Sequence, residues 1–129
     1  MPHNIPLMRR VLDHITAHPD QHDQSNYTRC VAGWAIKLDG YWAFLNPGAG
    51  FAAIEVVDFH TGNIEYTDDV ARDLLGLDEA EAEFLILNAD NQQARAWLED
   101  ALASHDGKVL AWLEASLVDD DYPFGQVTA

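Results

Sequence analysis

Cysteine and positive charge are both scarce in this chain. It has one cysteine, and 7 lysines and arginines stand against 22 aspartates and glutamates, which gives a formal net charge of −15 at pH 7. A single cysteine, Cys30, cannot form a disulfide within the chain or build a zinc ribbon, and this usage is typical of a reducing compartment. The negative charge repels nucleic acid and anionic lipid, so we expect no direct binding to either.

Long apolar runs are missing as well. No stretch approaches the roughly 18 consecutive apolar residues that a membrane helix requires. The N-terminus also lacks the apolar segment of a signal peptide. We therefore predict a cytoplasmic protein without a membrane partner.

The motifs of several common site types do not occur either. Pro47, Gly48 and Gly50 are not followed by Lys-Ser or Lys-Thr, as a phosphate-binding loop requires, so we expect them to form a turn. The sequence has no His-Glu-x-x-His element and no Asp-x-Asp-x-Asp-Gly loop, which argues against dedicated zinc and calcium sites. We expect no cofactor and no bound metal.

What the chain does contain is enough apolar material for a core. Hydrophobic residues make up 48% of the sequence and four tryptophans are spread through it, which argues against a wholly disordered acidic chain. A length of 129 residues suits one domain. We predict a single globular domain over residues 1–118, followed by an acidic, flexible tail over 119–129.

The spacing of the apolar residues is mostly helical. It predicts a mainly α (α+β) fold of about five or six helices, with a small antiparallel sheet inserted near residues 41–67. Asn4 and Pro6 favour a first helix over Ile5–Ala17, and Pro19 forbids its continuation.

A second helix is expected to pack against the first as an antiparallel pair. Ser25 or Asn26 is expected to cap it, Tyr27 begins its apolar stripe, and Gly40 follows its end. Gly33 inside this helix costs about 1 kcal/mol relative to alanine, so we expect another backbone to approach closely there.

Aromatic and β-branched runs replace the helical pattern between residues 41 and 67. Strands are expected at residues 41–45, 53–59 and 63–66. The turn residues at 60–63 predict that the last two strands form a hairpin.

Helix signals return at Thr67, which is expected to cap a helix over residues 68–75 that Gly76 ends. Two further helix starts are marked by capping boxes, in which an Asp and a Glu or Gln three residues later cap each other's backbone N–H groups. These boxes are Asp78 with Glu81 and Asp90 with Gln93, and a separate last helix is expected over Lys108–Leu117.

One core is expected from the apolar faces of these helices, because side chains at helical spacing line one side of each. Trp34 is a large member, and its truncation to alanine would cost about 3 to 5 kcal/mol in a full core position. The predicted core residues are Leu12, Ile15, Val31, Trp34, Leu74, Leu85, Trp97 and Leu98.

Charge is unevenly distributed along the chain. In residues 1–40, Asp13, Asp20, Asp23 and Asp39 are cancelled by Arg9, Arg10, Arg29 and Lys37, and four of the six histidines lie in this segment. The remaining residues carry 18 acids against Arg72, Arg95 and Lys108. The first segment is therefore neutral at pH 7 and is expected to become cationic near pH 6.

Two blocks of the sequence are distinctive. The first contains His18-Pro19, Asp23-Gln24-Ser25, Tyr27 and Cys30-Val31-Ala32-Gly33-Trp34-Ala35, and the second is Val70-Ala71-Arg72-Asp73-Leu74-Leu75-Gly76-Leu77. Together, over about residues 7–103, they resemble a group of small, mostly uncharacterised proteins of actinobacteria and their phages and plasmids. The Cys-Gly-Thr element common in that group is missing here. The resemblance implies an architecture and an origin, not an activity.

Cys30 and three histidines are candidates for catalysis or metal binding. We expect Cys30 about one turn inside the second helix, beside Arg29, where a helix N-terminus and a cation lower a thiol pKa. His14, His18 and His22 are spaced four apart, which allows a Cys–His pair or adventitious binding of Zn²⁺ or Ni²⁺. We favour a buried, inert thiol and a solvated histidine face, because cysteine is among the most buried residue types.

The acidic side chains exceed what helix capping requires, since several lie beyond the first helical turns, where the dipole effect has faded. We predict a non-enzymatic, acidic protein-binding factor that presents a negatively charged helical face to a basic protein partner, with DNA mimicry as a narrower form. Its predicted contact residues are Glu79, Glu83, Glu99 and Asp100. The alternative is a small cysteine- or metal-dependent enzyme built on Cys30 and the N-terminal histidines. The partner's identity and the oligomeric state are left open.

Overall fold

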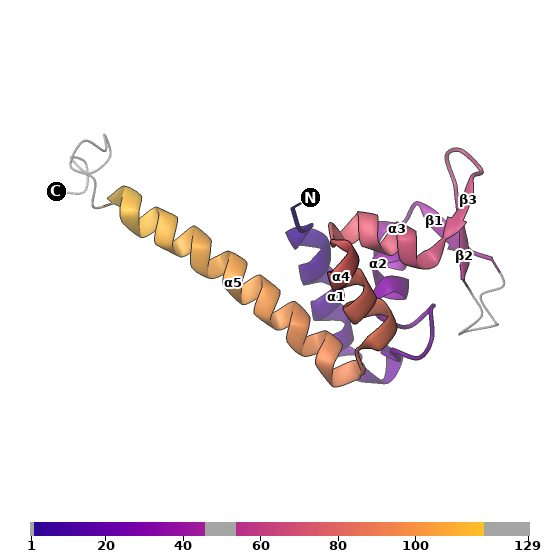
Figure 1. Cartoon of the computed structure of the whole chain (residues 1–129), viewed down its shortest axis with the longest axis horizontal. Coiled ribbons are helices and arrows are strands. Elements are labelled where there is room, and N and C mark those ends of the chain that lie inside the picture. The colour runs from indigo at the N-terminus through magenta and orange to yellow at the C-terminus, as the bar shows by residue number, and fades with distance from the viewer. Residues whose placement is uncertain (1, 46–53, 118–129) are drawn as a thin grey trace. The chain divides into compact units, whose positions relative to one another are not determined.

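The computed structural model describes residues 2–45 and 54–117 (Figure 1). The contacts between residues divide the chain into two units, Met1–Glu99 and Asp100–Ala129. The expectation of one domain over residues 1–118 therefore stays a prediction. The tail over 119–129 and the turn at Pro47, Gly48 and Gly50 lie outside the described residues.

The described residues are mainly helical with a small antiparallel sheet, as the sequence predicts. Five α-helices occur in these ranges, together with a 3₁₀ segment, a π-helical segment and three strands. The helices are α1 (Ile5–Ala17), α2 (Val31–Asp39), α3 (Thr67–Leu75), α4 (Glu79–Ala82) and α5 (Asn91–Leu117). The other elements are η1 (Pro19–Gln21, 3₁₀), η3 (Glu83–Asn88, π), β1 (Trp42–Phe44), β2 (Glu55–Asp58) and β3 (Ile64–Tyr66).

The first helix has the predicted bounds because its start and end signals are local. The Asn4 side chain accepts a hydrogen bond from the Leu7 N–H, and Pro6 occupies the first turn, where its missing N–H costs nothing. The helix ends before Pro19, which begins η1. The buried face of α1 is made of Leu7, Met8, Val11 and Ile15.

The second helix begins later than predicted. Its N-cap is Cys30, not Ser25 or Asn26, so Cys30 precedes the helix and does not lie one turn inside it. The Asn26 carboxamide oxygen instead accepts from the N–H and hydroxyl of Thr28, which closes a local turn. The cap for α2 comes from Gln24, whose carboxamide oxygen accepts from the Val31 N–H at 2.8 Å.

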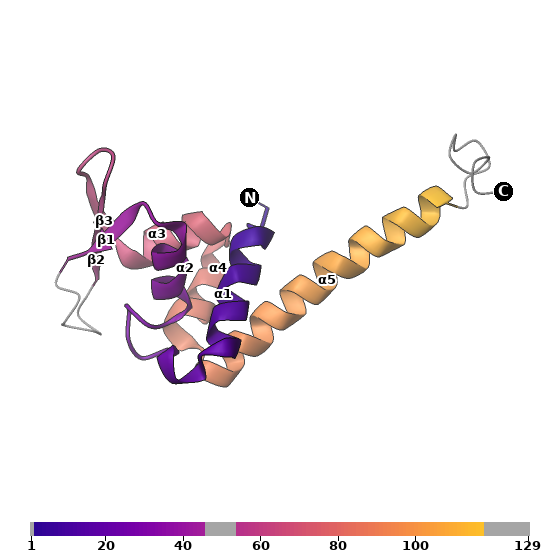
Figure 2. The same ribbon diagram turned by 180° about the vertical axis from the view of Figure 1, so that it is seen from behind.

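Gly33 marks a close approach of two backbones, as predicted. It lies in α2, and a Cβ atom there would overlap the backbone carbonyl groups of Tyr27 and Thr28. The turn before α2 is therefore folded directly onto the helix. Helices α1 and α2 also contact each other, and both views of the ribbon place them side by side (Figures 1 and 2).

The three strands form one antiparallel sheet in the order β1-β2-β3. In the register, Trp42 is opposite Asp58 and Val57 is opposite Ile64, so the predicted hairpin between the second and third strands is confirmed. All three strands are shorter than predicted, and Ala53 lies outside the described residues.

The starts of α4 and α5 follow the predicted capping chemistry, but the predicted cap of α3 is wrong, because Thr67 is the first residue of that helix and Tyr66, its N-cap, makes no side-chain capping hydrogen bond. Helix α3 ends at Gly76, whose φ of 71° is a left-handed conformation that glycine adopts without strain. At the start of α4, Asp78 accepts from the Glu81 N–H, and the Glu81 carboxylate accepts from the Asp78 N–H. Asp90 and Gln93 form the same reciprocal pair before α5.

Two features of the second half differ from the prediction. Residues 83–88 form a π-helical segment, in which the Ala89 N–H donates to the Phe84 carbonyl five residues earlier. The expected separate helix over Lys108–Leu117 is wrong, since α5 runs through without a break. No proline interrupts α5, and Gly107 alone costs only about 1 kcal/mol, too little to end a helix.

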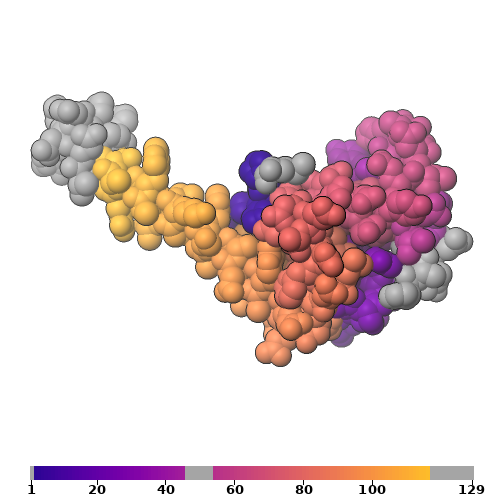
Figure 3. Space-filling view, in the orientation of Figure 1, coloured from indigo at the N-terminus to yellow at the C-terminus, as the bar shows by residue number. Residues whose placement is uncertain are grey.

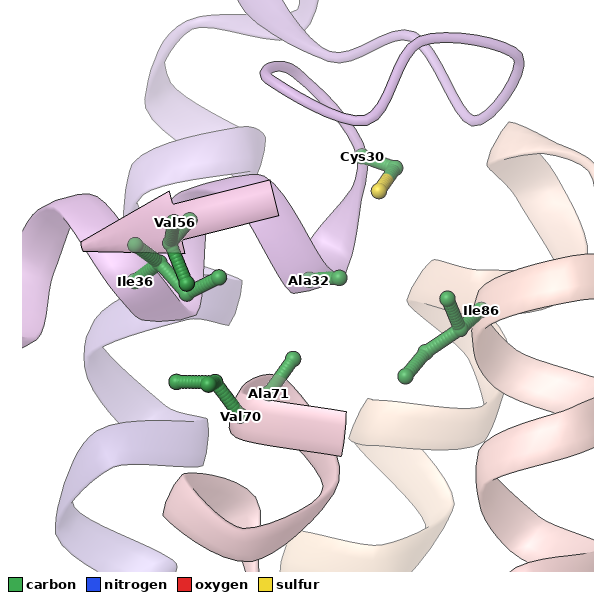
Figure 4. Packing of buried hydrophobic residues seen from close by; sticks show 7 residues of the cluster. All are labelled: Cys30, Ala32, Ile36, Val56, Val70, Ala71 and Ile86. Atoms are coloured by element: carbon green, nitrogen blue, oxygen red, sulfur yellow. The ribbon is translucent and has the colours of Figure 1, made fainter. Parts of the chain in front are cut away.

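The core lies between α1, α2, α3, η3 and the first part of α5. Figure 4 shows one buried cluster of it, which is formed by Cys30, Ala32, Ile36, Val56, Val70, Ala71 and Ile86. Of the predicted core residues, Ile15, Val31, Leu85 and Leu98 are buried, whereas Leu12, Trp34, Leu74 and Trp97 are only partly buried. Among the helices in the described ranges, none has the length and apolar character needed to cross a membrane.

Candidate functional site

Acidic side chains gather around one surface depression, here called the acidic hollow. It has a volume of about 230 Å³ and lies between α3 on one side and α4 with η3 on the other. Its charged lining residues are Asp68, Asp69, Arg72, Glu79 and Glu83, so four carboxylates face one guanidinium. In Figure 3 the salmon-coloured atoms of α4 and η3 lie on the visible face, uncovered by other described segments.

The carboxylates of this region differ in what they already bind. Glu81 caps α4 and also accepts a hydrogen bond from the His3 ring at 2.8 Å, so both of its oxygens have partners. Asp69 lies 3.6 Å from an Arg72 guanidinium nitrogen. Glu79 and Glu83 are exposed, and within the described ranges their carboxylates have no hydrogen bond or ion pair. These two are exposed carboxylates available to a partner, whereas Asp68 in the same lining is half-buried.

The other two predicted contact residues, Glu99 and Asp100, lie on α5 and do not line the acidic hollow. Both are exposed. The Glu99 carboxylate lies 3.8 Å from the Arg95 guanidinium, one helical turn earlier, which neutralises part of its charge. Of the four predicted residues, the structure therefore brings Glu79 and Glu83 together.

Cys30 has the environment of a structural thiol. Its side chain is 1% exposed, and its sulfur lies 3.8 Å from the Tyr27 carbonyl oxygen. Burial raises the pKa of the thiol, which outweighs the hydrogen bonds from the backbone N–H groups at the start of α2 that lower it. A thiolate nucleophile requires the opposite shift and access to solvent.

The three spaced histidines are each engaged by a different neighbour. The His14 ring is 3.9 Å from the Trp34 ring and 4.9 Å from the His18 ring, centroid to centroid, and its Nε2 is hydrogen-bonded to Gln21. His22 is buried and hydrogen-bonded to Gln24, and this burial lowers its pKa. Between residues 2 and 45 and between 54 and 117, no three His, Cys, Asp or Glu side chains form a group suited to a metal ion.

A second and larger depression lies beside the acidic hollow, and we call it the loop cavity. It measures about 680 Å³ and is bounded by residues 23–27 on one side and 86–92 on the other. Cavities of this size are in the range of small-ligand sites, about 300 to 1,000 Å³. Its polar side chains are those of Asp23, Gln24, Ser25, Asn26, Tyr27, Asn88, Asp90, Asn91 and Gln92, and its apolar ones are those of Ile86, Leu87 and Ala89.

Hydrogen bonds across more than sixty residues hold the two walls of the loop cavity in place. The Gln24 side chain donates to the Leu85 carbonyl at 2.8 Å. Asn91 accepts from the Gln24 N–H at 2.7 Å and donates to the His22 carbonyl at 2.9 Å. The Arg29 guanidinium further fixes the loop by donating to the carbonyl groups of Asp20 and Gln21.

Apolar atoms make up most of the surface that lines the loop cavity, and the carboxylates of Asp23 and Asp90 are among its polar groups. Hydrogen bonds from the hydroxyl and N–H of Ser25 hold the pKa of Asp23 below its ordinary value, which favours the carboxylate. Burial, followed by the negative charge of Asp68, raises the pKa of the Tyr27 phenol and favours its neutral form. Among the described residues, the lining carries two carboxylates and no lysine, arginine or histidine, so the cavity does not suit an anion.

The two depressions adjoin each other. Ile86 and Leu87 of η3 line both of them. Tyr27 of the loop cavity is close enough to Asp68 of the acidic hollow for that charge to affect its pKa. A ligand longer than one depression would pass over Leu87, an exposed leucine.

Sequence reasoning missed the loop cavity because its two walls are distant in the chain. Asp23-Gln24-Ser25 belongs to the first distinctive block of the sequence, and no short-range pattern connects it with residues 88–91. The available signal in the sequence is the amide-rich run over 88–93, whose side chains offer both hydrogen-bond donors and acceptors.

Comparison with known proteins found no match among protein-family models, curated proteins or solved structures. The resemblance to small actinobacterial and phage proteins therefore stays a prediction.

Proposed function

We propose that this chain is a non-enzymatic protein-binding factor that presents a negatively charged helical face to a basic protein partner. The observation that carries the proposal is the acidic hollow, where four carboxylates surround one depression and face a single guanidinium. Glu79 and Glu83 are exposed there and have no bonding role in the described fold. Charges arranged in this way steer an oppositely charged partner and accelerate its association.

The properties of Cys30 support a binding role over the enzymatic alternative. A buried thiol with a raised pKa is a poor nucleophile. Of the nearby histidines, His14 is hydrogen-bonded to Gln21 and lies against the Trp34 ring, His22 is buried and hydrogen-bonded to Gln24, and His18 is exposed. Cysteine-dependent catalysis needs an exposed, activated thiol, which the buried Cys30 does not offer.

The test begins with the full chain as bait in an extract of its host, with captured proteins identified by mass spectrometry. The association rate of the purified partner is then measured at low and at physiological salt. Because exposed charges are screened beyond about 8 Å at 0.15 M salt, we expect a marked fall in that rate. A rate independent of salt would mean that the acidic face serves solubility alone.

Charge reversals distinguish the effect of this acidic face on the association rate from the effect of the net charge of the chain. The double variant Glu79→Lys with Glu83→Lys is expected to lower the association rate more than Glu99→Lys with Asp100→Lys, since Glu99 is already paired with Arg95. The matched control is the pair Asp13→Lys and Asp39→Lys, which changes the net charge equally on α1 and α2. Equal effects of all three pairs would contradict a localised site.

In its narrowest form the proposal is DNA mimicry by a factor of phage or mobile-element origin, in which carboxylates stand in for phosphates. The partner would then be a DNA-binding protein, and double-stranded DNA would compete with this chain for it. A partner that binds DNA and this chain simultaneously would contradict mimicry and leave basic-partner binding intact.

A further inference from the structure

We propose that the loop cavity binds an extended segment of the partner's chain, with an apolar side chain on Ile86 and Leu87 and a neighbouring Lys or Arg side chain in the acidic hollow. This inference rests on the proposed function and makes it more specific. It assigns a role to the larger of the two adjoining depressions, which the acidic face alone does not use.

The wall of the loop cavity carries carboxamide groups that are free to bind a peptide backbone. Asn88 and Gln92 are exposed, and their carboxamide groups make no hydrogen bond to the described part of the chain. The Asn26 oxygen already accepts two hydrogen bonds from Thr28, which leaves its NH₂ group to donate. A carboxamide offers both donors and acceptors, which match the alternating N–H and C=O groups of an extended peptide.

The negative charge of the two depressions favours a ligand with a basic side chain. Asp23 and Asp90 lie at the cavity, four carboxylates line the adjoining acidic hollow, and Arg72 is the one cation among the described residues of the two linings. An acidic peptide, a phosphate or a nucleic acid would meet this charge without compensation. A segment with a basic side chain is complementary to it.

The two depressions form a continuous surface. Because Ile86 and Leu87 line both depressions, one ligand can occupy both without leaving the surface. A compact small molecule would fill the loop cavity and leave the acidic hollow empty. An extended chain advances by about 3.3 Å per residue and reaches the acidic hollow a few residues after the apolar anchor.

The walls of the loop cavity are held in place before a ligand binds. The cavity walls are fixed by the hydrogen bonds of Gln24 and Asn91, so these groups need no ordering when a ligand binds. Preorganisation of this kind lowers the entropic cost of association. The π-helical turn adds to this argument, since such turns are frequent at functional sites.

The probe is a displayed library of random short peptides, selected on the immobilised full chain. We expect enrichment of sequences that combine an apolar residue with a Lys or Arg a few positions away. A synthetic peptide of the consensus sequence is then titrated into ¹⁵N-labelled protein. The side-chain NH₂ signals of Asn26, Asn88 and Gln92 should shift, whereas that of Gln93, which caps α5, should not.

Two variants test the cavity directly. Gln92→Arg places bulk and positive charge at the cavity and should weaken peptide binding about tenfold, a change of 1.4 kcal/mol. Asn88→Arg on η3 provides a second variant of the same kind. The control Ala96→Arg adds the same charge at an exposed site one turn along α5, outside the cavity, and should change the affinity less than about twofold.

The outcomes distinguish this inference from the proposed function. Basic peptides that lose affinity with Glu79→Lys and Glu83→Lys but not with Gln92→Arg would overturn the cavity inference and leave the acidic face in place. Peptides without Lys or Arg that shift the cavity amides would support the cavity and overturn the basic partner. Equal enrichment on the Gln92→Arg protein, or shifts of the same amide signals with protein concentration alone, would overturn the inference.

Discussion

Two polar segments lie on opposite sides of the loop cavity and use their side chains differently. In residues 18–30, Asp23, Gln24, Asn26 and Arg29 are all bound to backbone or side-chain groups of the fold. In residues 79–92, Glu79, Glu83, Asn88 and Gln92 are exposed and make no hydrogen bond to the described chain. These side chains of the first segment build the fold, whereas the four of the second segment face solvent beside Glu81, Asp90 and Asn91, which are bonded to the fold.

This difference predicts how each of the two segments responds to substitution. A bonded polar side chain cannot be removed without leaving its partner unsatisfied, which costs about 1 to 3 kcal/mol for each buried group. An exposed, unbonded carboxylate contributes little to stability. We expect the first segment to respond to mutation through folding and the second through binding.

The largest expected effect is at Gly33. In Gly33→Ala the new Cβ would overlap the backbone of Tyr27 and Thr28, so the turn must move away from α2 at a cost of about 3 kcal/mol or more. The matched control is Gly107→Ala in α5, where a Cβ meets nothing and the helix gains about 0.5 to 1 kcal/mol. Urea unfolding of both variants measures these opposite signs, and a stable Gly33→Ala protein would contradict the close approach.

The next effect sharpens the comparison by using one residue type in both segments. Gln24→Ala removes the cap of Val31 and the bonds to His22 and Leu85, and we expect a loss of about 2 to 4 kcal/mol. Gln92→Ala removes no bond to the described chain and should change stability by less than about 0.5 kcal/mol. Chemical denaturation measures the free energy of unfolding of both variants. Similar losses of stability in the two variants would remove the distinction between the segments.

A smaller effect is expected from pH, through His22. Burial lowers the pKa of His22 in the folded chain below its ordinary value of 6.5. Between these two pKa values the unfolded chain binds the proton and the folded chain does not, so stability falls as the pH is lowered from 7. Thermal unfolding between pH 7 and about 5.5 should show a smaller decrease for His22→Gln than for wild type.

The control for this experiment is His18→Gln, because His18 is exposed at the end of α1. That variant should keep the wild-type decrease between pH 7 and 5.5. If His22→Gln and wild type lose stability in parallel, another group accounts for the pH dependence. The result also bears on the charge of residues 1–40, since a His22 that stays neutral makes these residues less cationic near pH 6.

The smallest expected effect is at Cys30. Cys30→Ala removes a sulfur from the buried cluster of Figure 4, together with its weak hydrogen bond to the Tyr27 carbonyl, and should cost about 1 kcal/mol while partner binding is retained. The native thiol should react with a thiol reagent far more slowly in the folded chain than in denaturant. Rapid stoichiometric labelling of the folded protein at neutral pH would contradict its burial and revive the enzymatic alternative.

The sequence by itself determined the elements whose signals are local. The bounds of α1 follow from Asn4, Pro6 and Pro19, and the end of α3 follows from Gly76. The capping boxes were predictable because both partners lie within one helical turn. The mainly helical fold with a small antiparallel sheet follows from the same short-range patterns.

Tertiary structure decided what depends on residues distant in the chain. Helix α2 begins at Val31 because the Gln24 side chain caps it, and Gln24 is positioned by Leu85 and Asn91, more than sixty residues away. The same contacts form the loop cavity and place it beside Glu79 and Glu83. No short-range pattern contains such contacts, because their free energy is gained only when the two segments meet.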